Sequence, residues 1–250
     1  MKTPDLKNYV SISILALFLL TSLNSCSISL DGPERIKGSK SVISEVRDVH
    51  YFNAIEVNNA TDLIVTIGEN FHIEVKADDN VVPFLMTEVE DDVLKIYVKK
   101  GYALRNVKTQ KVYVTMPLLT SISASGASNV SFSNLLEGDA LSIRASGASN
   151  VKLEADLAYL EVRLSGASDL GISGFSEYTN VRLSGASDMK SYDFACDLLE
   201  VVLSGASDIN ITVNEKVSGN ISGASGIKVK GNPVIDVKTS GASSVRKIAG

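Results

Sequence analysis

The chain has 250 residues, of which 44% are hydrophobic and 21% charged, a composition typical of folded proteins rather than disordered ones. Its 18 glycines, its five prolines and the absence of tryptophan favour a repetitive β architecture. Because the formal net charge is −5, the chain has no basic excess with which to neutralise a phosphate backbone, and nucleic acid is excluded as a partner.

Residues 1–25 have the features of a lipoprotein signal peptide. Lys2 and Lys7 make the start basic, and the apolar run over residues 10–23 is shorter than a membrane span. The run ends in Leu23-Asn24-Ser25-Cys26, which resembles the lipobox of bacterial lipoproteins. We therefore predict that Cys26 is lipidated and anchors an outer-membrane lipoprotein that faces the periplasm or the cell surface. An ordinary cleaved signal that contains a cysteine is the alternative.

Residues 26–45 are expected to join the lipid to the folded part as a polar tether, because residues 27–45 show no clear apolar period. The other cysteine of the chain is Cys196, so no intramolecular disulfide can form once Cys26 carries lipid. Cys196 lies in an apolar stretch, and we interpret it as a small buried hydrophobe rather than a reactive thiol.

Strand-like alternation starts near residue 46. Leu63, Val65 and Ile67 alternate with other residues ahead of a turn at residues 68–70, and residues 89–98 predict a hairpin or corner around an Asp-Asp pair. Residues 58–62 look like a degenerate copy of the repeat that dominates the rest of the chain. We therefore place a single β domain over residues 46–250.

The tetrapeptide Ser-Gly-Ala-Ser occurs seven times after residue 124. Its copies lie 18 to 21 residues apart, and such a period predicts a solenoid of stacked coils. The repeat glycines, to which we assign a structural role, are Gly126, Gly147, Gly166, Gly185, Gly205, Gly223 and Gly241.

Residues on both sides of each tetrapeptide alternate with a period of two, which is a strand pattern. A leucine-rich repeat fits less well, because no helical period follows the strands. The pattern predicts an all-β fold, a parallel β-helix with coils of about 18–21 residues. We expect the repeat glycine and the second serine to point inward at a corner, together with Ile143, Leu164, Leu183, Leu203 and Ile221 before the tetrapeptide and Val151, Leu170, Met189, Ile209, Ile227 and Val245 after it.

Two sets of polar residues have the opposite parity and should face solvent in columns. Arg144, Arg163 and Arg182 precede the tetrapeptide, and they are followed beyond it by Asn129, Asn150, Asp169, Asp188 and Asp208. We interpret both columns as solubilising edges of the sheets, in which Asn and Asp also stabilise turns. A calcium site at Asp169, Asp188 and Asp208 is a second hypothesis, and no other metal site is expected.

Three parts of the sequence resemble the auto-transporter adhesin or head GIN domain family, which is common in lipoproteins of Bacteroidetes. They are Phe-Asn-Ala-Ile-Glu-Val at residues 52–57, Val-Glu-Asp-Asp-Val-Leu-Lys-Ile-Tyr at residues 89–97, and the tetrapeptide series. The resemblance implies a pectate-lyase-like, right-handed, single-stranded parallel β-helix. It implies no catalytic residues, and the kinship of fold with polysaccharide lyases is an analogy only.

The sequence shows no convergent set of catalytic groups. Its two histidines, His50 and His72, lie outside the clear repeats, and we expect His72 to point outward from a strand. No phosphate-binding loop or zinc spacing occurs, so we predict neither a cofactor nor catalysis. The scattered aromatic residues of the repeats are expected to pack in the core or at corners: Tyr159, Phe175, Tyr178, Tyr192 and Phe194.

Three functions are consistent with these features. The first is a lipid-anchored, non-catalytic adhesion or ligand-display module, with an unknown protein or glycan as ligand, the membrane as partner through Cys26, and self-association as a further possibility. The second is a structural component of the envelope. The third is a protein that binds polysaccharides or resembles a lyase.

Overall fold

A computed structural model describes residues 32–248, so the predicted signal peptide and Cys26 lie outside the described residues. Of the described residues, 35–248 form one compact unit. The strands before the repeats are β1 (Glu34–Lys37), β2 (Val42–Arg47), β3 (Ala54–Val57), β4 (Asp62–Ile67), β5 (His72–Asp78), β6 (Leu85–Glu90), β7 (Val93–Val98), β8 (Tyr102–Arg105) and β9 (Gln110–Met116), with a 3-10 helix at η1 (Val82–Phe84). Those of the repeats are β10 (Ser121–Ala124), β11 (Asn129–Phe132), β12 (Leu136–Ala145), β13 (Asn150–Leu164), β14 (Asp169–Leu183), β15 (Asp188–Leu203), β16 (Asp208–Ile221), β17 (Gly226–Lys230), β18 (Val234–Thr239) and β19 (Ser244–Lys247). Within residues 32–248, no helix is long and apolar enough to span a membrane.

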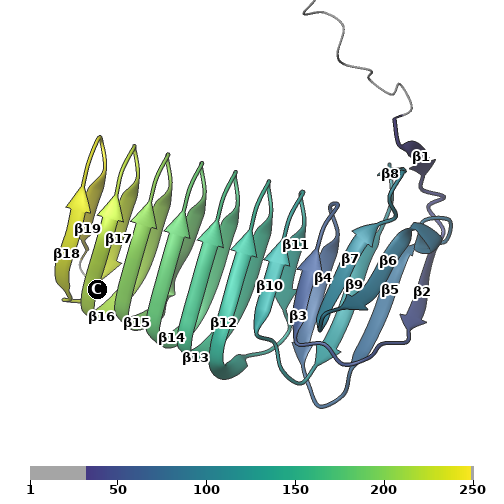
Figure 1. The fold of residues 1–250 in the computed structure, drawn as a ribbon, viewed down its shortest axis with the longest axis horizontal. Helices are drawn as coiled ribbons and strands as arrows, with labels where there is room; N and C mark the ends of the chain where they lie inside the picture. The colour runs from purple at the N-terminus through teal and green to yellow at the C-terminus, as the bar shows by residue number, and fades with distance from the viewer. Residues whose placement is uncertain (1–31, 249–250) are drawn as a thin grey trace, which may run out of the picture. The chain divides into compact units, whose positions relative to one another are not determined.

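The chain from β10 onward winds into stacked coils (Figure 1), which confirms the predicted all-β parallel β-helix. Every coil pairs in parallel with the coil before it. Paired residues are 21 apart between β10 and β12, 19 apart between β13 and β14, and 18 apart between β16 and β17, as the spacing of the repeats predicted.

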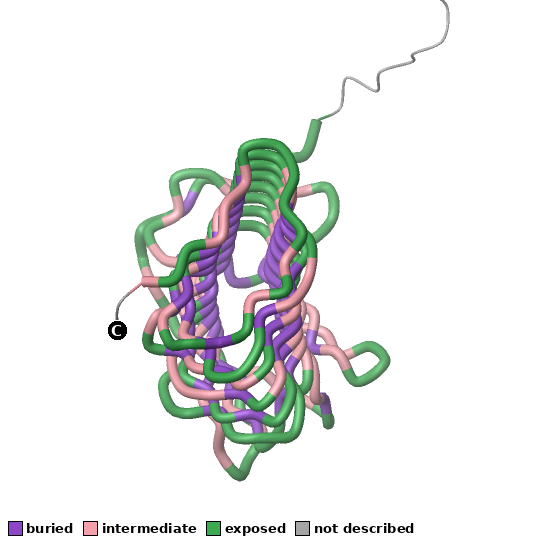
Figure 2. The backbone as a smooth tube through the Cα atoms, turned by 90° about the vertical axis from the view of Figure 1, so that its left-hand side faces the viewer, coloured by how far each residue is buried: buried purple, intermediate pink, exposed green. Residues whose placement is uncertain are grey.

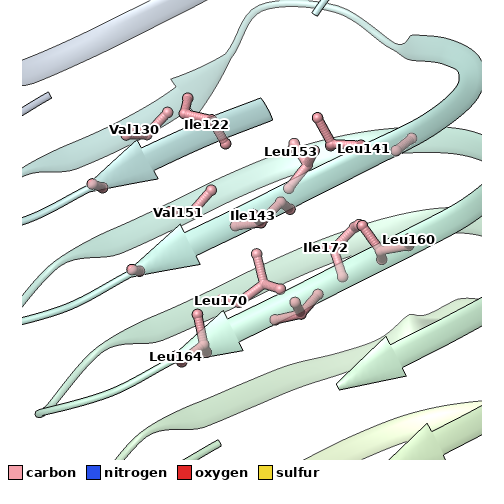
Figure 3. Packing of buried hydrophobic residues seen from close by; sticks show 14 of the residues in the cluster. Ile122, Val130, Leu141, Ile143, Val151, Leu153, Leu160, Leu164, Leu170 and Ile172 are labelled. Carbon is pink, nitrogen blue, oxygen red and sulfur yellow. The ribbon is translucent and has the colours of Figure 1, made fainter. Parts of the chain in front are cut away.

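The core lies inside the coils, where the buried residues line the inner sides of the stack (Figure 2) and their apolar side chains meet (Figure 3). The predicted column after the tetrapeptide is confirmed, because Val151, Leu170, Met189 and Ile209 pair in succession and are buried. The predicted column before the tetrapeptide is wrong at one residue. Although Ile143 points inward, it pairs with Val162, and Ala145 is the residue in register with Leu164.

Each tetrapeptide forms a tight turn at which the two-residue alternation stops. As predicted, the second serine is buried in every copy but the last, where Ser243 is half-buried. In most copies its hydroxyl donates to the carbonyl of the first serine, at 2.9 Å for Ser168 and Ser165. The glycine is exposed, contrary to the prediction that it points inward. Gly166 has φ of 76°, a left-handed conformation that turns the chain outward, and the strand parity therefore does not extend through the turn.

The turns stack backbone on backbone. Ala167 N–H donates to the Gly147 carbonyl at 2.7 Å, and Ala186 N–H donates to the Gly166 carbonyl at 2.8 Å. A Cβ at Gly166 would lie 2.5 Å from the Gly147 carbonyl oxygen, closer than non-bonded atoms can approach. The repeat glycine is therefore required both by its φ and by the turn beneath it.

The degenerate copy at residues 58–62 has the geometry of a repeat turn. Asn59 and Ala60 have φ of 63° and 58°, and the Thr61 hydroxyl donates to the Asn58 carbonyl at 2.9 Å, in the manner of the second serine. β3 and β4 on either side of it pair in parallel with β10 and β11. The prediction that this segment is a copy of the repeat is confirmed.

The first part of the folded unit departs from the parallel pattern. β2 pairs antiparallel with β5, β5 pairs antiparallel with β9, and β6 and β7 form the predicted hairpin, turned by Asp91 and Asp92 at φ of 51° and 60°. Because β2 starts at Val42, the folded unit begins inside the segment expected to be a tether. A parallel β-helix thus does not account for all of residues 46–250.

A buried carboxylate holds together the loops of this first part. Asp78 accepts backbone N–H groups from Lys40 at 2.9 Å and from Lys108 and Thr109 at 3.1 Å. Burial by itself would raise the pKa of Asp78, but these donors together hold the pKa below its ordinary value. A Cβ at Gly38 would lie 2.3 Å from the Asp78 carboxylate, so the glycine leaves room for it.

Replacement of a repeat glycine should destabilise the protein. Gly185 has φ of 77°, and an added Cβ would lie 2.5 Å from the Gly166 carbonyl oxygen, so Gly185→Ala should lower the free energy of unfolding by about 2 to 5 kcal/mol in denaturant titrations. The control is Gly171→Ala, whose Cβ would meet no atom closer than 4.0 Å and should change stability by less than about 1 kcal/mol. Equal stabilities of the two variants would contradict this account of the turn.

Asp78 should make stability dependent on pH. Its folded pKa is lowered, so its contribution is present above the unfolded value of about 3.9 and is lost as pH falls through the folded pKa. Asp78→Asn should lower the unfolding temperature by about 4 °C or more at neutral pH, and the difference from wild type should shrink below about pH 3. The exposed Asp139 provides the control variant Asp139→Asn. A deficit of Asp78→Asn that stays constant down to about pH 2 would rule out this role of the carboxylate.

Candidate functional site

One outward face of the coils carries a column of cations. Arg144, Arg163 and Arg182 are in register on β12, β13 and β14, directly before the turns, and all three are exposed. The structure therefore bears out both their parity and their stacking. We call these three residues the Arg column. It ends at Val202, which occupies the next position in register.

The Arg column lines a groove of about 460 Å³ that runs across several coils. The first serines of four consecutive turns line it as well, and we call them the outer serines: Ser146, Ser165, Ser184 and Ser204. The outer serines are half-buried, and their hydroxyls make no hydrogen bond with another described residue. We call this feature the Arg–Ser groove.

Glu161 lies beside the Arg column and partly neutralises it. Its carboxylate is 2.7 Å from Arg163 Nη2 and 3.7 Å from Arg144 Nη2, and it accepts a hydrogen bond from the Ser142 hydroxyl at 3.1 Å. Arg163 is the main reason why the pKa of Glu161 is lowered. Arg182 reaches only the amide oxygen of Asn180, at 3.4 Å, and has no ion pair within residues 32–248.

Two tyrosines stack on the same strands, four residues before the arginines. The rings of Tyr159 and Tyr178 are nearly parallel, with centroids 5.5 Å apart. Tyr178 donates to Glu200 at 2.5 Å, which raises the pKa of the phenol. The pair lies about 13 Å from the Arg column at roughly 3.3 Å per residue.

The aromatic residues were predicted to pack in the core or at corners, and this is only partly right. Phe194 is fully buried, whereas Tyr159 is 39% exposed. The sequence held a signal for the surface pair, because Tyr159 and Tyr178 have the same 19-residue spacing as Arg163 and Arg182.

The second predicted column lies on the other side of the turns. Asp169, Asp188 and Asp208 are in register, and Asp188 is paired with Lys190 at 3.0 Å. The asparagines below them form a ladder, in which Asn150 donates to Asn129 at 2.9 Å. Over residues 32–248 no three acidic, histidine or cysteine side chains are grouped closely enough to hold a metal ion, and the aspartates do not converge on one point.

The remaining candidates for chemistry are dispersed. His50 and His72 are exposed, and neither side chain forms a hydrogen bond with another described residue. Cys196 is fully buried, and burial raises the pKa of its thiol to about 12, which fits the interpretation of a structural residue.

A further hollow of about 490 Å³ lies beside β8, but residues that line it form hydrogen bonds that hold together the strands before the repeats. Gln110, for example, donates there to the Asn59 carbonyl and to the Thr61 hydroxyl. Of these surfaces, the Arg–Ser groove combines charge with unoccupied hydrogen-bonding groups, and we take it as the candidate binding site.

Known proteins resemble the chain in sequence and in structure. Residues 51–233 match the family described as "Putative auto-transporter adhesin, head GIN domain". A crystal structure of a putative adhesin from Bacteroides fragilis is similar, with a TM-score of 0.81 and 25% identity over 85% of this chain and 100% of that one. The structure of a putative lipid binding protein from Parabacteroides distasonis has a TM-score of 0.73 and 22% identity over 86% and 100% of the chains, which shows likeness of fold. The same holds for a putative adhesin from Parabacteroides merdae, with a TM-score of 0.66 and 20% identity over 86% and 99%. No curated protein matches the chain.

Proposed function

Because the chain belongs to the auto-transporter adhesin, head GIN domain family over residues 51–233, we propose that it is a lipid-anchored adhesion module of the cell envelope that binds a ligand without catalysis. Membership of the family supports an adhesin-like protein of the envelope. The observation that carries the more specific proposal is the Arg–Ser groove, which crosses several coils and presents an arginine and a serine on three successive coils.

A repeated surface of this kind suits binding better than turnover. Catalysis needs different groups that converge on one reacting atom, such as a nucleophile beside its base. The groove instead repeats a guanidinium and a hydroxyl from coil to coil, and the outer serines have no histidine or carboxylate within hydrogen-bonding distance. Several equivalent weak contacts along one ligand add to its affinity.

The proposed anchor is the lipid on Cys26, which follows the lipobox-like Leu23-Asn24-Ser25. The compact unit starts at residue 35, so only a short segment separates it from the lipid. Anchoring through lipid also suits a protein of net charge −5, because such a protein gains nothing from an anionic membrane surface.

Two experiments test the proposed anchor and the proposed binding separately. Wild-type protein should fractionate with membranes, Cys26→Ala should be released, and Cys196→Ala, which changes the buried cysteine, should remain with the membranes. The purified wild-type protein should be retained on an array of glycans and matrix proteins without converting the ligand that retains it. Membrane retention of Cys26→Ala together with the absence of lipid on the wild-type protein would disprove the anchor. Failure to bind any ligand on the array would count against the adhesion module.

A further inference from the structure

We propose that the Arg–Ser groove binds an unbranched polysaccharide that carries one carboxylate on each sugar, and that the chain lies along the stack of coils. This inference rests on the proposed function and adds to it the chemical class of the ligand. It is carried by three features of the groove: its charge, its spacing and its free hydroxyls.

The charge of the groove is positive within an acidic protein. The formal net charge of the chain is −5, yet three guanidinium groups line this groove, and one carboxylate, that of Glu161, contacts two of them, Arg144 and Arg163. Arginine stays protonated at all physiological pH values, and its planar fork matches a carboxylate with two parallel hydrogen bonds. Arg182, which has no ion pair within residues 32–248, is the most open of the three to an anion.

The spacing of the charges selects the kind of polymer. Arginines in register on adjacent parallel strands repeat at about 4.8 Å, close to the length of one sugar residue in an extended chain. An extended acidic peptide places side chains on one face only every 6.6 Å or so, because alternate residues point away. A uronic acid chain whose glycosidic torsions turn successive carboxylates to one side therefore brings one carboxylate to each arginine, whereas the longer repeat of a peptide strand does not match the spacing of the column.

The outer serines of the groove suit a ligand rich in hydroxyl groups. Each outer serine presents a hydroxyl that makes no hydrogen bond with a described residue, and the four of them span three coil steps, about 14 Å. Each hydroxyl can donate one hydrogen bond and accept two, as sugar hydroxyls also do. The column of cations stops at Val202, so the site holds three acidic sugars in register.

The test uses the full-length protein in detergent, with polygalacturonate as the probe and calorimetry as the readout. The fully methyl-esterified polymer has the same backbone without the charge, and poly-glutamate has the charge without the sugar. We expect binding to polygalacturonate only. The double variant Arg163→Gln/Arg182→Gln should weaken it at least about tenfold, because two charge-assisted contacts are lost.

Arg246→Gln serves as the matched control, since Arg246 is an exposed arginine on β19 outside the groove, and it should leave the affinity within about twofold of wild type. Oligomers of galacturonate should gain affinity up to three sugars and little beyond. Arg246→Gln should unfold at the wild-type temperature, because the changed side chain lies on the surface. The double variant also loses the ion pair of Arg163 with Glu161, but it should remain folded at the temperature of the binding assay.

Several results would overturn the inference: no binding of polygalacturonate, binding that survives the double variant, or equal binding of poly-glutamate or of the esterified polymer. Failure of the inference can be told apart from failure of the proposed function. If the array retains the protein through another ligand while polygalacturonate does not bind, the adhesion module stands and the ligand class is wrong. If nothing on the array or in the calorimeter binds, both are wrong.

Discussion

The close approach of successive turn backbones is the constraint on which the rest of this structure depends. The alanine N–H of one turn donates to the glycine carbonyl of the turn before it, at 2.7 Å between Ala167 and Gly147, and this leaves no room for a side chain on the glycine. The contact fixes the register at one end of every coil. In-register strands then stack like residues on like residues, apolar ones inside and polar ones outside. The Arg column and its groove are consequences of this register rather than separate features.

Much of the fold was predictable because a β-helix repeats its local rules. Parity predicted the inward columns, the buried second serines and the exposed Arg column, and residue types alone identified the degenerate copy at residues 58–62. The errors have physical causes. A left-handed φ at Gly166 interrupts the alternation, and the 19-residue pairing of β12 with β13 puts the small Ala145, not Ile143, in register with Leu164. The antiparallel pairing of β2 and β5 could not be predicted from the sequence, because apolar and polar residues alternate with the same period in parallel and antiparallel strands.

The candidate site was predictable in its residues but not in its shape. The sequence places Arg144, Arg163 and Arg182 in one column, and on that basis they were interpreted as a solubilising edge. The arginine positions and the outer serines lie two residues apart along the chain, and only the structure shows that both line one groove. The neutralising contact of Glu161 with two arginines, and the stacking of Tyr159 on Tyr178, depend on side-chain conformations that no periodicity specifies.

Coils of nearly equal sequence pose a problem during folding, since a strand can pair with the wrong neighbour and still match leucine to leucine. Here the coils differ in length. The register between β14 and β15 shifts between Leu170 and Gly174, and that between β15 and β16 shifts twice, near Ser191 and near Cys196. A chain displaced by one whole coil would set these irregular segments against regular strands and lose hydrogen bonds there. These bulges, which lie outside the turns, differ from coil to coil and therefore favour the pairing of each coil with its proper neighbour. The turns cannot do so, because their sequence is the same in every repeat.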